Sequence, residues 1–173
     1  MDKLTVDDFK AMLRNALVCI TERADEFSKL DAVLGDGDHG TAIVQSMSAL
    51  VATAEQGTEF RSMLNDMSFH LMLEISGSTS TLLGGFFLGM SDHAAGVELD
   101  AAGVKAMFAG GLEGVRKQTK AKQGDKTMMD ALIPAVEAIQ ACNSTDVKTI
   151  LLAGAEAAVK GAEATKEMKA NFG

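Results

Sequence analysis

Residues 30–40 read Leu-Asp-Ala-Val-Leu-Gly-Asp-Gly-Asp-His-Gly and separate the helical patterns on either side of them. Each of the three glycines would cost about 1 kcal/mol relative to alanine inside a helix, and aspartate prefers to bond nearby backbone, so the segment is expected to form a tight loop. In such a loop Asp31, Asp36 and Asp38 can converge. Three carboxylates at close range repel one another unless a cation lies among them, and oxygen ligands suit Mg²⁺, Mn²⁺ or Ca²⁺. The stretch therefore predicts a divalent-metal site at Asp31, Asp36 and Asp38.

The same loop admits three other interpretations. Its glycines fit the Gly-x-Gly-x-x-Gly pattern of dinucleotide-binding folds, but carboxylates would repel a pyrophosphate, and residues 29–34 are too poor in β-branched types for a strand. A calcium loop that starts at Asp36 would need a bidentate glutamate where Met47 stands. An acidic helix cap needs one aspartate rather than three. The metal site is the interpretation that uses all three carboxylates.

Composition favours one helical domain. The chain has 173 residues, 47% of them hydrophobic, and it contains neither Trp nor Tyr, so Ala, Leu, Met and Gly must fill most of the interior. That mixture packs helices more readily than sheets. The formal net charge of -8 disfavours nucleic acid as a partner. No apolar run is long enough to cross a membrane or to serve as a leader, and Cys19 and Cys142 are expected to be buried reduced thiols, which is typical of a cytoplasmic protein.

Apolar residues recur at spacings of three and four along most of the chain, and no segment alternates strictly with period two. Thr5 and Asp8 form a capping box, so the first helix is expected to start at Val6 and to run unbroken past Phe27. The further helices are expected at about 41–56, 59–75, 78–95, 101–119, 127–141 and 145–169. Short loops join them, which predicts an all-α fold: an up-and-down antiparallel barrel or bundle of seven to eight helices in a single domain.

Two further stretches suggest an anionic ligand. Residues 76–81 read Ser-Gly-Ser-Thr-Ser-Thr and open a helix, where free N–H groups and hydroxyls at the positive end of the helix dipole suit an anion; an ordinary Ser/Thr cap fits them equally well. Residues 120–126 carry three lysines just before a second capping box, and a solvated loop explains these as well. In an up-and-down bundle alternate loops lie at the same end, so these stretches and residues 30–40 are expected to meet.

Residues 30–40, together with Gly-Asp-Lys-Thr-Met at 124–128 and with Asp130 and Pro134 after it, resemble the nucleotide-binding L subunit or domain of dihydroxyacetone kinases. The likeness covers nearly the whole chain. It implies an antiparallel helical barrel that binds ADP or ATP through two Mg²⁺ held by the three aspartates. It also implies a phosphotransferase subunit with no catalytic residue separate from the metal and nucleotide site.

The resemblance also implies a role for each matching residue. The nucleotide contacts implied are His39, Gly40 and Thr41 at the phosphates, Ser78 and Thr79 at a second helix start, and Thr119 and Met128 at the nucleoside. The sugar would be held by a separate K-type subunit, and in some systems a phosphohistidine protein of the phosphotransferase system would rephosphorylate bound ADP. His70 and His93 lie outside the motifs and are expected to be structural.

Two features depart from that family's pattern. The family usually has Gly-Gly-Ala/Ser-Ser-Gly-Pro where this chain has residues 76–81, which suggests a variant subgroup with another keto-sugar substrate. Family members also continue past Gly173 with an Arg-bearing segment, an Asp-Pro-Gly loop and a last helix. Residues 1–173 are thus expected to be a DhaL-like nucleotide-binding domain that lacks these elements.

Three functions are compatible with these residues. The first is transfer of a phosphoryl group from ADP/ATP and Mg²⁺ to dihydroxyacetone or a related keto-sugar on the partner subunit. The second is a non-catalytic nucleotide-binding module that signals the state of the kinase to a regulator. The third, a stand-alone metal hydrolase, needs a general base that only His39 offers.

Overall fold

The computed structural model describes residues 1–33, 35–75 and 77–172. Leu34 of the stretch 30–40, Ser76 of the stretch 76–81, and Gly173 lie outside the described residues. Within the described ranges the chain forms eight α-helices, one 3₁₀ turn and one pair of very short strands. The elements are β1 (Leu4–Thr5), α1 (Val6–Glu22), α2 (Ala24–Asp31), α3 (His39–Gln56), α4 (Phe60–Glu74), α5 (Ser78–Ser91), β2 (Glu98–Leu99), α6 (Ala101–Arg116), α7 (Met129–Ala141), α8 (Val147–Ala164) and η1 (Thr165–Glu167). The predicted all-α fold is confirmed.

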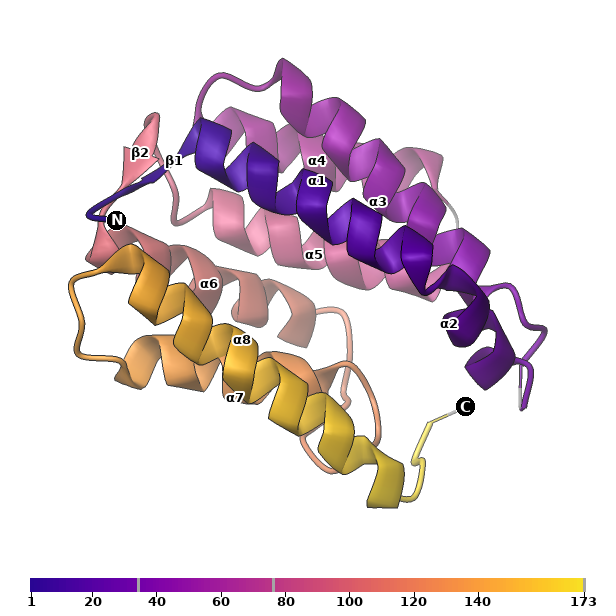
Figure 1. Cartoon of the computed structure of the whole chain (residues 1–173). Helices are drawn as coiled ribbons and strands as arrows, with labels where there is room; N and C mark the ends of the chain where they lie inside the picture. The colour runs from indigo at the N-terminus through magenta and orange to yellow at the C-terminus, as the bar shows by residue number, and fades with distance from the viewer. Residues whose placement is uncertain (34, 76, 173) are drawn as a thin grey trace.

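α2 continues from the end of α1, and from α3 onward consecutive helices pack side by side and run in alternating directions (Figure 1). The most extensive packing joins α4 to α5, α5 to α6, and α7 to α8, while α1 lies against α3. Because the connections are short, they gather at the two ends of the bundle. The N-terminus and both strands lie at one end, and the α2–α3, α4–α5 and α6–α7 connections lie at the other.

The first helix was predicted to run unbroken past Phe27, but the structure divides it into two helices. α1 ends at Glu22, and α2 starts after Arg23, whose backbone (φ -110°, ψ 7°) departs from the helix. The hydroxyl of Thr21 donates to the Leu17 carbonyl (2.7 Å), a bond that tends to bend helices, and the Arg23 guanidinium pairs with Glu26 (2.9 Å) in the first turn of α2. The bend directs α2 onto the start of α3, and α2 buries none of its residues fully.

The expected capping box at the start of α1 is present. Asp8 N–H donates to Thr5 Oγ1 (3.1 Å), and Thr5 N–H donates to the Asp8 carboxylate (3.1 Å). Thr5 also belongs to β1, which pairs antiparallel with β2 through Leu4↔Leu99 and Thr5↔Glu98. The sequence did not predict this pair, because two residues are too few to show a period of two.

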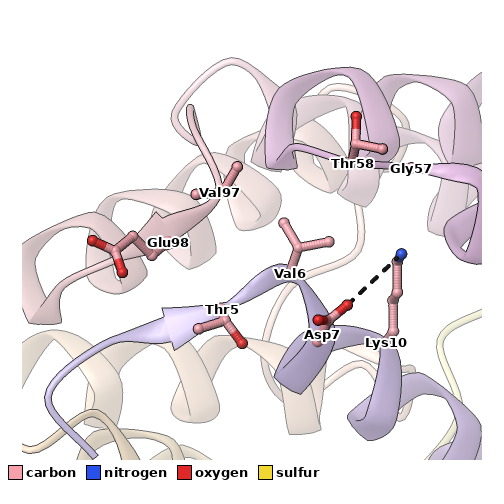
Figure 2. A pocket seen from close by; sticks show the side chains of 8 residues that line it. All are labelled: Thr5, Val6, Asp7, Lys10, Gly57, Thr58, Val97 and Glu98. Carbon is pink, nitrogen blue, oxygen red and sulfur yellow. Dashed lines mark ion pairs between the residues drawn. The ribbon is translucent and has the colours of Figure 1, made fainter.

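A surface cavity of about 390 Å³ lies at this strand-bearing end, between α1 and the 57–58 and 97–98 connections (Figure 2). Lys10 points into it, with Nζ 3.4 Å from the Glu55 carbonyl and 4.0 Å from Asp7 Oδ1. Lys10 thus contacts Asp7 and neighbouring backbone, Glu98 pairs with Lys3, and the cavity is at the opposite end of the bundle from the three aspartates.

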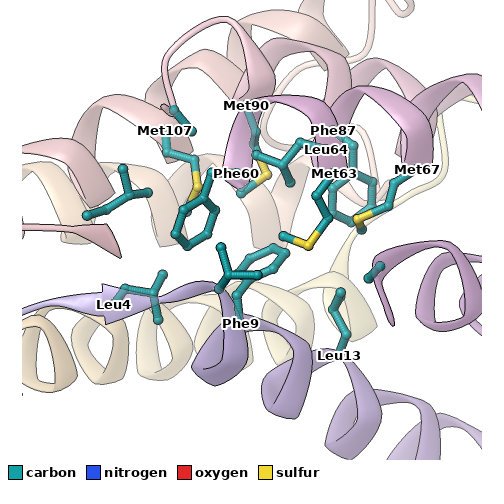
Figure 3. Packing of buried hydrophobic residues seen from close by; sticks show 14 of the residues in the cluster. Leu4, Phe9, Leu13, Phe60, Met63, Leu64, Met67, Phe87, Met90 and Met107 are labelled. Atoms are coloured by element: carbon teal, nitrogen blue, oxygen red, sulfur yellow. The ribbon is translucent and has the colours of Figure 1, made fainter. Parts of the chain in front are cut away.

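The main core is built from aliphatic side chains, methionine and phenylalanine (Figure 3). Apolar residues at spacings of three and four give α4 a fully buried stripe, which consists of Phe60, Met63, Leu64, Met67 and Leu71. Leu4 and Phe9, on either side of the start of α1, are both buried there, and the Phe9 and Phe60 rings meet edge to face with centroids 5.8 Å apart. Met12, at the same three-and-four spacing on α1, is 39% exposed and lines a surface groove together with residues of α6, α7 and α8.

Glycines bring α5 and α6 into backbone contact. A Cβ added at Gly89 would lie 2.1 Å from the Gly110 carbonyl oxygen, and one at Gly114 would lie 2.0 Å from that of Gly85. The close approach of α6 compensates the glycines of α5, which by themselves weaken that helix.

The prediction of two buried thiols is wrong. Both cysteines are free, Cys19 is exposed and Cys142 is half-buried. Cys19 lies on α1 beside the stripe that Phe9 and Leu13 begin, and Cys142 follows the last residue of α7. None of the helices described is long and apolar enough to span a membrane.

Candidate functional site

The three aspartates of residues 30–40 converge. One carboxylate oxygen from each of Asp31, Asp36 and Asp38 can be chosen so that all lie within 4.8 Å of one another. Asp31 is the last residue of α2 and is half-buried, whereas Asp36 and Asp38 are exposed. The loop is shorter than predicted, because α2 extends through Asp31 and α3 starts at His39.

Glycine is needed where the backbone wraps around Asp31. The Gly37 N–H donates to Asp31 Oδ2 (2.9 Å). Gly37 has a left-handed backbone conformation (φ 79°), which is unfavourable for any residue that has a Cβ atom. A Cβ at Gly35 would lie 2.5 Å from Asp31 Oδ1. The alternation of glycine and aspartate thus lets the chain turn tightly around one carboxylate and present the next two beside it.

The electrostatics of the cluster match a cation site. The negative charge of Asp36, followed by a hydrogen bond with it and a smaller effect of Asp31, raises the pKa of Asp38 above its ordinary value. A divalent cation among the three groups would reverse this repulsion and stabilise the charged forms. The donor set, three carboxylates on one turn, fits Mg²⁺ or Mn²⁺.

The start of α3 adjoins this cluster. His39 and Thr41 are exposed in its first turn, and Asp38 precedes them without capping the helix through its side chain. Gly40 is buried against α2. Its N–H donates to Ser28 Oγ (3.1 Å), and a Cβ at this position would lie 2.0 Å from the Ala24 carbonyl oxygen. Gly40 therefore holds α2 against α3, and its amide is already engaged within the chain.

The start of α5 forms a second turn of small polar residues. Gly77, at φ 119°, precedes Ser78, which is exposed, and Thr79, which is half-buried. Ser80 is buried and its hydroxyl bonds to the Ile75 and Gly77 carbonyls (2.7 and 2.8 Å). Ser80 is thus committed to shaping the turn, and Ser78 and Thr79 are the hydroxyls available to a ligand.

The third region is the connection between α6 and α7. Thr119 is half-buried and its hydroxyl accepts from Ala121 N–H (3.1 Å), while Met128 is 37% exposed. The capping box predicted for α7 is half present: Thr127 N–H donates to Asp130 Oδ2 (2.8 Å), but Thr127 Oγ1 accepts from Met129 N–H rather than from Asp130. Asp130, whose burial the sequence did not predict, is 1% exposed.

These three regions lie at the same end of the bundle, as the alternation of helix directions predicts (Figure 1). The end of α8 and the turn after it lie near the start of α2, because Glu163 acts electrostatically on Arg23 and Lys166 acts on Glu26. An acidic cluster, two helix N-termini and a lysine-bearing loop thus lie at one end of the bundle. Such a set can hold a cation together with a phosphorylated ligand.

Comparison with known proteins identifies the family of the chain. Residues 33–173 match the DAK2 domain family. The chain is 30% identical over 156 residues to the ADP-binding subunit DhaL of PEP-dependent dihydroxyacetone kinase 1 from Listeria innocua, covering 89% of this chain and 74% of that one. It is also 34% identical over 154 residues to the triokinase/FMN cyclase of Bos taurus, covering 86% of this chain but 26% of that enzyme.

The fold has a solved counterpart. The dihydroxyacetone kinase from C. freundii, in complex with AMP-PNP and Mg²⁺, superposes with a TM-score of 0.72 over 92% of this chain and 29% of that one, at 22% identity. The chain therefore corresponds to about a quarter of the larger enzymes and to most of the separate subunits.

Proposed function

The chain belongs to the DAK2 domain family, and we propose that residues 1–173 form the nucleotide-binding domain of a kinase for dihydroxyacetone or a related keto-sugar. It is a homologue of ADP-binding subunits of dihydroxyacetone kinases. The observation that carries the proposal is the convergence of Asp31, Asp36 and Asp38 within 4.8 Å, beside the start of α3.

In this proposal the three aspartates hold two Mg²⁺, and the starts of α3 and α5 receive the phosphates of ADP or ATP. Bound Mg²⁺ would neutralise charge on the phosphate oxygens while a phosphoryl group moves. His39 and Thr41 are exposed beside the aspartates and can reach a phosphate with side chain or amide, and Gly40 between them lets α2 pack directly against this helix start. Ser78 and Thr79 supply hydroxyls and N–H groups at the second helix start.

The nucleoside is assigned to the α6–α7 connection. Met128 offers an exposed apolar side chain to a base, and the half-buried Thr119 lies at the start of the same connection. The lysines of residues 120–126 supply positive charge in a chain whose net charge is -8. This division places the phosphates at the helix starts and the base against the loop.

The acceptor sugar is assigned to a separate K-type subunit. In the described part of the chain, no histidine other than His39 belongs to the three regions of the site. The phosphoryl donor is either free ATP or a phosphohistidine protein that recharges bound ADP. The names of two relatives, "PEP-dependent" in Listeria innocua and "PTS-dependent" in Lactococcus lactis, favour the second route.

Calorimetry with ADP and Mg²⁺ tests the binding part of the proposal. The wild-type chain is expected to bind, and Asp36→Asn is expected to weaken binding at least about tenfold, since it removes one charged ligand. Asp92→Asn, at an exposed aspartate after α5 and away from the cluster, is the matched control and should bind normally. Undiminished binding by Asp36→Asn would refute the assignment of the aspartates.

Turnover is tested by mixing the chain with a K-type subunit, a triose and a phosphoryl donor. Formation of sugar phosphate supports the kinase. Nucleotide binding without turnover would instead favour the second function, a non-catalytic module that reports nucleotide state to a regulator.

A further inference from the structure

The α6–α7 connection is held from within by a buried carboxylate. Asp130 Oδ1 accepts from Gly124 N–H (2.5 Å) and Oδ2 accepts from Thr127 N–H (2.8 Å), so one side chain fixes both sides of the turn. Gly124 (φ 97°) and Lys126 (φ 60°) are both left-handed, and Lys126 is the only non-glycine residue with positive φ in the described ranges. A lysine in this conformation is unfavourable by itself, so surrounding contacts must maintain it.

The same turn is held from outside by the chain that follows α8. Asn171 Nδ2 donates to Asp125 Oδ1 (2.7 Å), and the Asn171 backbone N–H donates to the Asp125 carbonyl (3.2 Å). Lys126 Nζ donates to the Met168 carbonyl (3.2 Å). The bond from Asn171, followed by one from Lys122 N–H, lowers the pKa of Asp125, so the carboxylate is charged at neutral pH.

The outer segment is itself anchored at the same end of the bundle. α8 meets the start of α7 closely, since a Cβ at Gly161 would lie 2.0 Å from the Asp130 carbonyl oxygen. The Thr165 hydroxyl donates to the Ala162 carbonyl (2.7 Å), and Met168 N–H donates to the Thr165 carbonyl (3.1 Å), which turns the chain after α8. In Figure 1 this yellow segment heads back toward α2, which carries Asp31.

We propose that Asp125 and Asn171 form a latch that positions residues 124–128 for the nucleoside. The proposal rests on the nucleotide-binding function proposed above and adds a positioning role for two residues that hold no metal or phosphate. A turn that is already ordered loses less conformational entropy when a ligand binds, so closing the latch strengthens nucleotide binding. Metal binding at the aspartates of the α2–α3 loop does not depend on it.

A charge substitution opens the latch without disturbing the core. Asn171→Asp places a second carboxylate against Asp125, and both positions are accessible, so the helices should fold as before. The double variant Asp125→Asn with Asn171→Asp reverses donor and acceptor and should restore the pair. Asn143→Asp makes the same change at an exposed asparagine beyond α7, at the other end of the bundle, and serves as the control.

Three measurements are made on each variant: calorimetry with Mg²⁺ and ADP, calorimetry with Mn²⁺ alone, and hydrogen exchange of the amides of residues 124–128. Asn171→Asp is expected to weaken ADP binding about tenfold and to speed exchange of these amides, with Mn²⁺ binding unchanged. The double variant is expected to regain most of the affinity, and Asn143→Asp to behave as the wild type.

The latch is refuted if Asn171→Asp binds ADP within twofold of the wild type, or if the double variant fails to recover affinity. A wild-type chain that binds Mn²⁺ but no ADP refutes the proposed function instead. In that case unchanged exchange at residues 124–128 in Asn171→Asp would refute the latch as a structural device as well.

Discussion

Gly89→Ala provides a quantitative test of the contact between α5 and α6. The added methyl group would lie 2.1 Å from the Gly110 carbonyl oxygen, 2.9 Å from its carbonyl carbon and 3.1 Å from Gly114 Cα. All three are backbone atoms of a neighbouring helix, so no side-chain rotation can relieve the overlap. Because non-bonded carbon atoms ordinarily lie at least about 3.5 Å apart, the two helices must separate by about 1 Å.

Two opposing effects decide the free energy of unfolding. Alanine favours a helix interior over glycine by about 1 kcal/mol, whereas overpacking of a well-packed site costs about 1–3 kcal/mol. The rigid neighbours place this site at the upper end of that range, so a net loss of about 2 kcal/mol is expected. For a chain of this length that loss lowers Tm by about 4–8 °C.

Thermal unfolding followed by circular dichroism at the helix band measures the change. Gly103→Ala is the control, because its Cβ would meet the Leu99 side chain at 3.3 Å and Asp100 Oδ1 at 3.4 Å, with no backbone atom closer. That variant gains up to about 1 kcal/mol of helix propensity against a small cost of contact with the Leu99 side chain, so its Tm is expected to equal or exceed that of the wild type. A Tm for Gly89→Ala equal to or above that of the wild type would show that the contact is not rigid.

Three further outcomes follow from charged groups. Asp38→Asn should abolish most Mn²⁺ binding in calorimetry yet leave the metal-free Tm unchanged or higher, because the charge of Asp36 raises the pKa of Asp38; a clear loss of metal-free stability would contradict this. Asp130→Ala should lower the free energy of unfolding, measured with urea, by about 2–4 kcal/mol, since it leaves two N–H groups unpaired; a loss below about 1 kcal/mol would mean that water replaces the carboxylate. Bonds from the N-terminal ammonium and Thr149 lower the pKa of Asp146, so its stabilising effect is complete above the usual value of 3.8 and is lost as pH falls below it. The Tm difference between Asp146→Ala and the wild type should therefore be present at pH 7 and shrink below pH 3.8, and a constant difference across that range would refute the linkage.

Local features could be predicted from the sequence because their causes lie within one or two helical turns. The capping box of Thr5 and Asp8, the buried stripe of α4 and the ends of most helices all depend on neighbouring residues. The convergence of Asp31, Asp36 and Asp38 is also local, since glycines between them allow only a tight turn. The likeness to dihydroxyacetone kinase subunits was likewise contained in short motifs.

The site as a whole could be predicted only in outline. Alternating helix directions placed the three connections at one end. The sequence did not show which polar groups there form hydrogen bonds within the protein. Ser80 bonds the turn before α5, and the Gly40 amide bonds Ser28, so neither is as available as its residue type suggests. Ser28 lies on α2, whose approach to α3 only the fold defines. The carbonyl that Ser80 bonds belongs to a turn whose shape the sequence did not specify.

The sequence by itself determined the helices, their order and the acidic turn, because hydrophobic spacing, caps and glycine act over a few residues. Only the tertiary structure decided which helices touch, how far α1 runs, that Cys19 faces solvent, and that Asp125 meets Asn171 across 46 positions. Such contacts depend on the packing of whole helices, where many weak interactions between distant residues compete and no short pattern records the outcome.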